Sequence, residues 1–351
     1  MPSDQDVIRA LSGVKDPELG RDVVSLHMVE GVKVDGGRVT FTLNLTTPAC
    51  PLRTRLEESA KGAVAAIPGV KEVEMRTGST VAATRDYADA DMLRGVKNII
   101  AVASGKGGVG KSTVAVNLAV ALAASGAKVG ILDADVYGPN IPLMMGAKSP
   151  PEVKGDKVVP PVAFGVKIAS LGFFYNEQTP VIWRGPLVAG AVRQLLTQVD
   201  WGELDYLVCD LPPGTGDSSL TLAQTVPLGG ILIVTTPQEA ALSIAAKALA
   251  MFKRLDVPIL GVVENMSYFV CPHCGERTSI FSSGGGRKIA AERNVDFLGE
   301  IPLAVAVREQ SDKGEPVVAA MPESPEAQVY KELAFRVAGM VSIVAFAKMR
   351  K

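Results

Sequence analysis

A glycine-rich segment constrains the fold of this chain more than any other feature. Residues 99–103 are the apolar run IIAVA, residues 105–112 match the pattern G-x-x-x-x-G-K-[S/T], and a helix is expected over residues 112–124. Glycines without a Cβ let backbone N–H groups approach phosphate oxygens, and this order of strand, loop and helix is the context that the pattern requires. The sequence therefore predicts a nucleotide-binding phosphate loop, or P-loop. A glycine-rich turn that binds nothing is the alternative.

The residues of this loop have separate expected roles. Lys111 is expected to reach the β- and γ-phosphates, Ser112 to bind Mg²⁺ and Thr113 to lie near the α-phosphate. Lys106 is a second lysine that the pattern does not need. The other expected nucleotide-binding residues of the loop are Gly105, Gly107, Gly108, Val109 and Gly110.

Carboxylates stand at the ends of two expected strands. Asp133 and Asp135 follow residues 128–132, and Asp210 follows residues 206–209. Parallel α/β sheets bind ligands at the carboxyl ends of their strands, so these side chains are expected to face the nucleotide. Asp210 is the expected Walker B residue, holding Mg²⁺ through water, and Asp133 or Asp135 is expected to orient the attacking water.

Two features just beyond Asp210 belong to the same prediction. Gly214 is expected to move as a sensor of the γ-phosphate. Asp217 is interpreted equally well as a functional residue or as a solvated loop cap.

The rest of the chain indicates two domains. In residues 1–82, an alternating apolar pattern, a hairpin turn and helical spacing predict the element order α-β-β-α-β. Residues 83–97 are polar and predict a linker. Residues 98–351 alternate strands with helices, which indicates a doubly wound, mostly parallel α/β sheet. The expected strands are residues 99–103, 128–132, 166–170, 206–209, 230–234, 259–263 and 297–301, and the expected helices include 112–124, 186–198, 238–253 and 325–346.

Composition argues against several functional classes. The 36 basic and 37 acidic residues nearly cancel, so no overall field attracts the chain to nucleic acid or to membranes. The first nine residues lack the apolar segment of a secretory signal, and the apolar run 337–347 is too short to span a bilayer. Four cysteines do not make a disulfide framework. We expect a soluble cytoplasmic protein without a nucleic-acid partner or stable membrane insertion.

Two cysteines form the segment Cys271-Pro-His-Cys274. This pair supplies two thiolates, whereas a tetrahedral metal or a cubane cluster takes four, and the chain has no second C-x-x-C pair. Two copies in a symmetric dimer would complete the set, for an iron–sulfur cluster or for Zn²⁺. A structural zinc knuckle and cysteines without a ligand remain alternatives, and His273 is interpreted as a loop residue. Cys209, inside an apolar strand, is expected to be a buried small hydrophobe.

Four motifs in order resemble one known family. GKGGVGKST, LDADVYGPN, CDLPPGTGD and ENMSYFVCPHCGE together resemble the Mrp/ApbC/Nbp family of iron–sulfur carrier ATPases. That family belongs to the deviant Walker A class, with the MinD and ParA ATPases and the nitrogenase iron protein. The resemblance runs from about residue 98 to the end. Residues 5–80, with DPELGRDVVSLHMV and TTPACP, resemble the small MIP18-type domain found ahead of some bacterial Mrp proteins.

The resemblance implies roles for particular residues. Lys106 is similar to the signature lysine of the class, which in a homodimer reaches the phosphates bound by the partner subunit, where negative charge develops. A solvated loop lysine is the alternative. Asn265 matches the position that recognises adenine, and a turn-forming Asn is the alternative. Cys271 and Cys274 from two subunits would share a [4Fe–4S] cluster.

The small domain carries its own matches to the MIP18-type pattern. Cys50 is expected to open a helix whose N–H groups favour a thiolate, and it resembles the cysteine that helps hand over clusters. A structural role for Cys50 is equally compatible with the sequence. Asp16 and Glu18 match the same pattern without a role that their chemistry defines.

The function implied by the resemblance is that of a homodimeric, Mg²⁺-dependent and slow ATPase that passes an iron–sulfur cluster to apo-proteins. Cluster scaffold or donor proteins would be further partners. The alternative is a positioning ATPase like MinD or ParA, with residues 325–346 as an amphipathic membrane anchor instead of a last core helix. The CPHC segment and the N-terminal domain count against that alternative. A third interpretation is a reductase like the nitrogenase iron protein.

Overall fold

The computed structural model describes residues 2–17, 19–50, 52–84, 93, 95–174 and 185–348. The chain forms two compact units, one of residues 1–82 with 338–351 and one of residues 83–337. Most of the predicted linker, residues 85–92 and 94, lies outside the described residues, as do Glu18 and residues 349–351.

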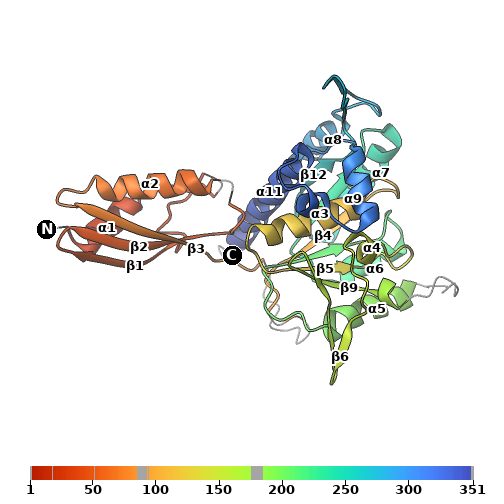
Figure 1. Ribbon diagram of the computed structural model, residues 1–351, viewed down its shortest axis with the longest axis horizontal. Coiled ribbons are helices and arrows are strands. Elements are labelled where there is room, and N and C mark those ends of the chain that lie inside the picture. The colour runs from red at the N-terminus through yellow and green to blue at the C-terminus, as the bar shows by residue number, and fades with distance from the viewer. Residues whose placement is uncertain are drawn as a thin grey trace. The chain divides into compact units, whose positions relative to one another are not determined.

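Unit 1 is a three-stranded sheet with two helices on one face (Figure 1). Strand β2 pairs antiparallel with β1 and parallel with β3. Along β2, Val39, Phe41, Leu43 and Leu45 are buried and the residues between them are partly exposed, so the predicted alternation and the order α-β-β-α-β are confirmed. In chain order the elements are α1 (Asp4–Leu11), β1 (Val29–Asp35), β2 (Arg38–Leu45), α2 (Arg53–Ala65) and β3 (Glu72–Ser79).

The expectation that Cys50 opens a helix is wrong by three residues. Helix α2 begins at Arg53, with Leu52 as its N-cap. A turn comes first, in which the N–H of Ala49 donates to the Thr47 hydroxyl at 3.1 Å. Cys50 lies in this turn and packs, half-buried, against the core of unit 1.

Unit 2 is built on an eight-stranded sheet in the order β15-β12-β11-β4-β10-β5-β9-β8. Every pairing is parallel except that of β8 with β9. The chain runs from central β4 to β5 and β9 on one side, then returns through β10 to β11, β12 and β15, so the predicted doubly wound sheet is confirmed. The strands are β4 (Ile99–Ser104), β5 (Val129–Asp133), β8 (Val162–Ala163), β9 (Val166–Ser170), β10 (Tyr206–Asp210), β11 (Gly230–Thr235), β12 (Ile259–Glu264) and β15 (Phe297–Glu300).

Helices cover this sheet (Figure 1). All residues of β4, β5, β10 and β11 are buried, which accounts for their unbroken apolar runs. The predicted proline-rich excursion contains a small hairpin of β6 (Glu152–Lys154) and β7 (Lys157–Val159). The helices are α3 (Lys111–Ala124), α4 (Ile141–Met144), α5 (Gly185–Gln198), α6 (Asp217–Thr225), α7 (Glu239–Arg254), α8 (Gly285–Arg293), α9 (Val305–Lys313), α10 (Val317–Ala320) and α11 (Pro325–Lys348), with a 3₁₀ turn at Leu171–Phe173.

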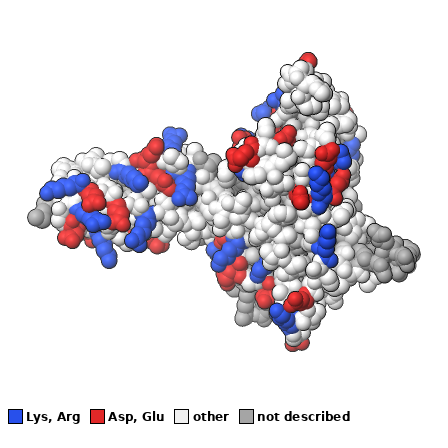
Figure 2. Space-filling view, in the orientation of Figure 1, with Lys and Arg blue, Asp and Glu red and all other residues white. Residues whose placement is uncertain are grey.

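The last helix, α11, uses its apolar residues for packing. Val337, Val341 and Ala345 are buried, and Phe346 packs against the core of unit 1. Within the described part of the chain, no helix combines the length and hydropathy needed to cross a membrane. Figure 2 shows Lys and Arg interspersed with Asp and Glu on the viewed face, in keeping with the balanced charge.

Candidate functional site

The P-loop connects the centre of the sheet to helix α3. Strand β4 ends at Ser104 and α3 begins at Lys111, with Gly110 as its N-cap. Gly108 and Gly110 have φ of +78° and +80°, which L side chains rarely adopt. A Cβ at Gly110 would also lie 2.2 Å from the side-chain nitrogen of Asn265. Glycine is therefore required at position 110 by its backbone and by its neighbour.

The structure brings four predicted site residues together beside this loop. The Nζ of Lys111 lies 2.6 Å from Oδ1 of Asp210 and 3.7 Å from Oδ2 of Asp135. The Ser112 hydroxyl donates to Oδ2 of Asp210 at 2.6 Å. The hydroxyl and carboxylate oxygens that were expected to hold Mg²⁺ are thus adjacent, and they are the ligand type that Mg²⁺ prefers.

The two aspartates after β5 have different surroundings. Asp135 lines the cavity at the P-loop. Asp133 is buried, and its carboxylate accepts from the Ser170 hydroxyl at 2.9 Å and from the N–H of Ile141 at 3.2 Å. Burial, reinforced by the charge of Asp210, raises the pKa of Asp133 to about 8. Burial also raises the pKa of Asp135, opposed by Lys111. Asp135 is therefore the better placed of the two toward a ligand, whereas Asp133 fixes the segment that follows β5.

A cavity of about 520 Å³ lies over the P-loop. It is lined by P-loop residues between Ser104 and Thr113, by Asn265 and Met266 after β12, and by residues from Pro302 to Asp312. The segment from Pro302 to Asp312, which lies after β15 and on α9, carries no motif. Its one sequence signal is position, because Pro302 follows an expected strand at the carboxyl edge of the sheet.

Three further predicted site residues form hydrogen bonds to other residues of the chain. The side-chain nitrogen of Asn265 donates to the carbonyl of Val109 at 2.8 Å. The Nζ of Lys106 donates to Oε1 of Gln238 at 3.0 Å. Gly214 has φ of +96°, and its N–H donates to the carbonyl of Ser104 at 2.9 Å. The side chain of Asp217 lies outside the described residues.

The cysteine pair Cys271 and Cys274 occupies the turn of a short hairpin. Strands β13 (Phe269–Val270) and β14 (Arg277–Thr278) pair antiparallel around it. Cys271 is half-buried and Cys274 is exposed. The N–H groups of Cys274 and His273, with the Cys274 thiol, lower the pKa of the Cys271 thiol.

A single copy does not complete a metal site at this hairpin. Among the residues that the structure describes, no group of three or more His, Cys, Asp and Glu is arranged to hold a metal ion. Cys209 is buried in β10, and burial raises its pKa. One chain therefore offers two accessible thiols at the hairpin.

Comparison with known proteins accounts for both units. Residues 95–338 match the ParA family model, described as the NUBPL iron-transfer P-loop NTPase. The chain belongs to this family. Residues 4–75 match the model of an iron–sulfur cluster assembly protein. The ParA/NUBPL domain thus carries the P-loop and the cysteine hairpin, and the resemblance drawn from the four motifs and from the N-terminal domain is confirmed.

Relatives of this ParA/NUBPL member match nearly the whole chain. An iron–sulfur cluster carrier protein of Synechocystis sp. is 49% identical over 97% of this chain and 98% of its own length. One of Deinococcus radiodurans is 48% identical over 96% and 95%. A nucleotide-binding protein of Archaeoglobus fulgidus, solved in complex with ADP, is 41% identical with a TM-score of 0.60, over 68% of this chain and 93% of its own.

Proposed function

We propose that this protein is an ATP-binding and ATP-hydrolysing carrier that holds an iron–sulfur cluster between two copies and delivers it to apo-proteins. The observation that carries this proposal is the position of Cys271. It lies six residues after Asn265, which contacts the P-loop. The printed names of the relatives, iron–sulfur cluster carrier protein, support the same role. The ADP complex of the Archaeoglobus relative supports the nucleotide.

The P-loop residues divide the proposed work on ATP. Lys111 is proposed to exchange its contact with Asp210 for the β- and γ-phosphates. Ser112 and Asp210 would hold Mg²⁺, which neutralises phosphate charge when bound. Asp135 is proposed to orient the attacking water, and Gly214 to sense the γ-phosphate. We expect this hydrolysis to be slow, as the resemblance to the deviant Walker A class implies.

Asn265 is proposed to read the adenine base. Its side-chain nitrogen carries two N–H groups, of which one donates to the carbonyl of Val109 and the second can donate to a base. Its side-chain oxygen can accept a hydrogen bond. An amide can therefore contact a base edge while it stays bonded to the P-loop. The apolar segment Pro302–Leu303, which also lines the cavity, supplies a surface against which a base can pack.

The cluster is cargo in this proposal, and its ligands come from both subunits. Two thiolates from each copy of Cys271 and Cys274 complete the four that a [4Fe–4S] cluster takes. The lowered pKa of Cys271 favours the thiolate that binds iron. Lys106, released from Gln238, is proposed to reach the phosphates of the partner copy. The thiols of Cys209, Cys271 and Cys274 are free, which fits a reducing compartment such as the cytoplasm.

The N-terminal unit is proposed to exchange clusters with donor or recipient proteins. Cys50 is its one cysteine and is only half-buried, so it is the residue through which such an exchange would pass.

Anaerobic reconstitution with iron and sulfide tests the proposal. The wild type should bind about two iron atoms per chain, the share expected when two chains hold one cubane cluster. The double variant Cys271→Ser/Cys274→Ser should lose the iron and the cluster absorbance, and the matched control Cys50→Ser should keep both. Iron that persists in the double variant, or zinc as the only metal that the two cysteines retain, would contradict the proposal.

A further inference from the structure

The cysteine hairpin belongs to an excursion whose two ends meet at one buried carboxylate. We call residues 267–284 the cysteine insert. Glu264, the last residue of β12, is fully buried. One of its oxygens accepts from the Ser267 hydroxyl at 2.6 Å and from the N–H of Gly284 at 3.0 Å, and the other accepts from the N–H of Gly286. Ser267 begins the insert and Gly284 ends it, so Glu264 ties the two ends together.

The beginning of the insert is continuous with the nucleotide cavity. Asn265 bonds to the P-loop, and Met266, which has φ of +55°, lines the same cavity. The N–H of Ser267 donates to the carbonyl of Ile301 at 3.0 Å, and the carbonyl of Tyr268 accepts from Leu303 at 2.7 Å. Leu303 also lines the cavity. Residues between Glu264 and the hairpin are thus bonded both to the P-loop and to Leu303, which both line the nucleotide cavity.

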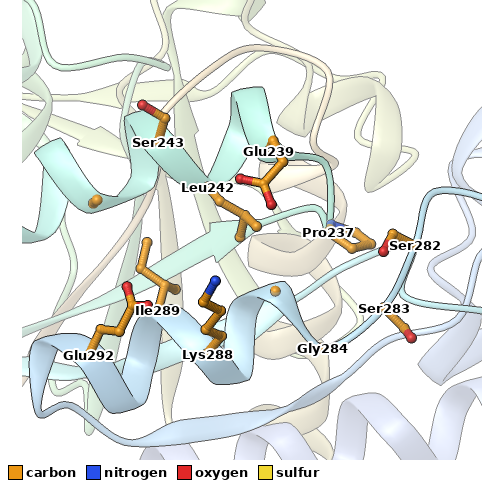
Figure 3. A pocket seen from close by; sticks show the side chains of 12 residues that line it. Pro237, Glu239, Leu242, Ser243, Ser282, Ser283, Gly284, Lys288, Ile289 and Glu292 are labelled. Carbon is orange, nitrogen blue, oxygen red and sulfur yellow. The ribbon is translucent and has the colours of Figure 1, made fainter.

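The end of the insert packs against a helix that also touches the P-loop. Figure 3 shows the beginning of α7 beside α8, with a cavity lined by both helices and with Leu242 pointing toward α8. A Cβ at Gly285 would lie 2.4 Å from Leu242, and a Cβ at Gly105 would lie 2.6 Å from the backbone nitrogen of Ala245. Lys106 bonds to Gln238, the N-cap of α7. Helix α7 therefore contacts both the P-loop and the residue that follows the insert.

We propose that Glu264 is a positioning residue that couples nucleotide binding at the P-loop to the geometry of Cys271 and Cys274. The insert begins two residues after Asn265, which bonds to the P-loop, and it ends at α8, which packs against α7 beside the P-loop. The carboxylate makes these two ends move together. The buried Glu264 carboxylate accepts from three donors and so holds the two ends in fixed positions. Breaking any of these hydrogen bonds would leave buried polar groups unsatisfied. The inference rests on the proposed function in one respect, that the P-loop binds ATP and the hairpin thiols bind the cargo.

The experiment measures the alkylation rate of Cys271 by N-ethylmaleimide in full-length protein free of iron, with and without Mg²⁺ and ATP. In the wild type, nucleotide should change this rate by about fivefold or more, the usual lower range of coupling between sites. Glu264→Gln and Ser267→Ala should bring the ratio of rates close to one. Their affinity for ADP should stay at the wild-type value, because neither side chain lines the cavity. Light scattering must give all variants the same association state.

The matched control is Ser342→Ala, which removes another buried hydroxyl, bonded within its own helix. This variant should keep the wild-type ratio. If Glu264→Gln does not fold, the result for Ser267→Ala tests the inference, because this variant removes one hydroxyl and leaves the Glu264 carboxylate with two donors. Variants that keep the wild-type ratio, or a wild type without any response to nucleotide, would overturn the inference. The alkylation experiment contains no iron. A failed iron reconstitution would therefore reject the carrier function without affecting the result on coupling between the P-loop and Cys271.

Discussion

The ammonium group of Lys111 lies 2.6 Å from a carboxylate oxygen of Asp210, and both side chains are buried. This ion pair joins the first residue of α3 to the last residue of β10, beside the central strand of the sheet. The two residues expected to meet ATP and Mg²⁺ therefore also neutralise each other within the protein. The same contact supports the fold and makes it sensitive to the loss of either charge.

Replacing Lys111 with methionine should strongly destabilise the nucleotide-free protein. The change leaves the Asp210 carboxylate buried without its cation, which typically costs about 3–5 kcal/mol of the free energy of unfolding. Lys97→Met is the control, because Lys97 pairs with Asp205 nearer the surface and should cost about 1 kcal/mol or less. Urea denaturation measures both. Equal losses in the two variants would show that the buried pair has no special weight.

Gly110→Ala should abolish ADP binding in calorimetry, because the added Cβ collides with Asn265 and deforms the P-loop. Gly126→Ala provides the comparison. Gly126 also has a positive φ, +99°, but open space surrounds the position of its Cβ. That variant should lose about 1–2 kcal/mol of stability from backbone strain alone and keep its ADP affinity. Normal ADP binding by Gly110→Ala would refute the described loop geometry.

The buried Asp133 should impose a pH dependence on stability in protein free of nucleotide and Mg²⁺. Its folded pKa of about 8 lies above the ordinary value of 3.8, so between these values the folded chain keeps a proton that the unfolded chain releases. Stability from this group is complete below the unfolded pKa and is lost as pH rises through the folded pKa. Relative to Asp133→Asn, the wild type should therefore become less stable from about pH 5 to about pH 8. Urea unfolding of both proteins in EDTA measures the difference, and a difference that stays constant or grows in favour of the wild type would contradict it.

Cys271 should react as a thiolate at lower pH than an ordinary cysteine. The N–H groups of Cys274 and His273 are the main causes of its lowered pKa, and they remain in Cys274→Ser. In that variant the iodoacetamide rate of Cys271 should reach half its maximum at a pH below the ordinary value of 9.0. Cys50 in the same protein, identified by peptide mass, gives an internal reference. A midpoint at or above the ordinary value would remove the electrostatic argument for this thiol.

Much of the fold follows from local pattern. The P-loop lies between a buried strand and a helix, and Asp135 and Asp210 meet because parallel strands end at one edge of the sheet. Other parts of the site depend on long-range packing. Leu303 reaches the cavity after β15, far along the chain from Lys111, and no motif marks it. In the same way, the motif that begins with Glu264 does not indicate its role, since two of its three donors are the backbone N–H groups of Gly284 and Gly286, which only the fold brings to it.

The central claim is that two copies share one cluster through Cys271 and Cys274. Native mass spectrometry of anaerobically reconstituted wild-type protein tests it most directly, because the mass reports chains and cluster atoms together. The account predicts a species of two chains with a single [4Fe–4S] cluster, which disappears in Cys271→Ser/Cys274→Ser. A single chain that carries the complete cluster would contradict it.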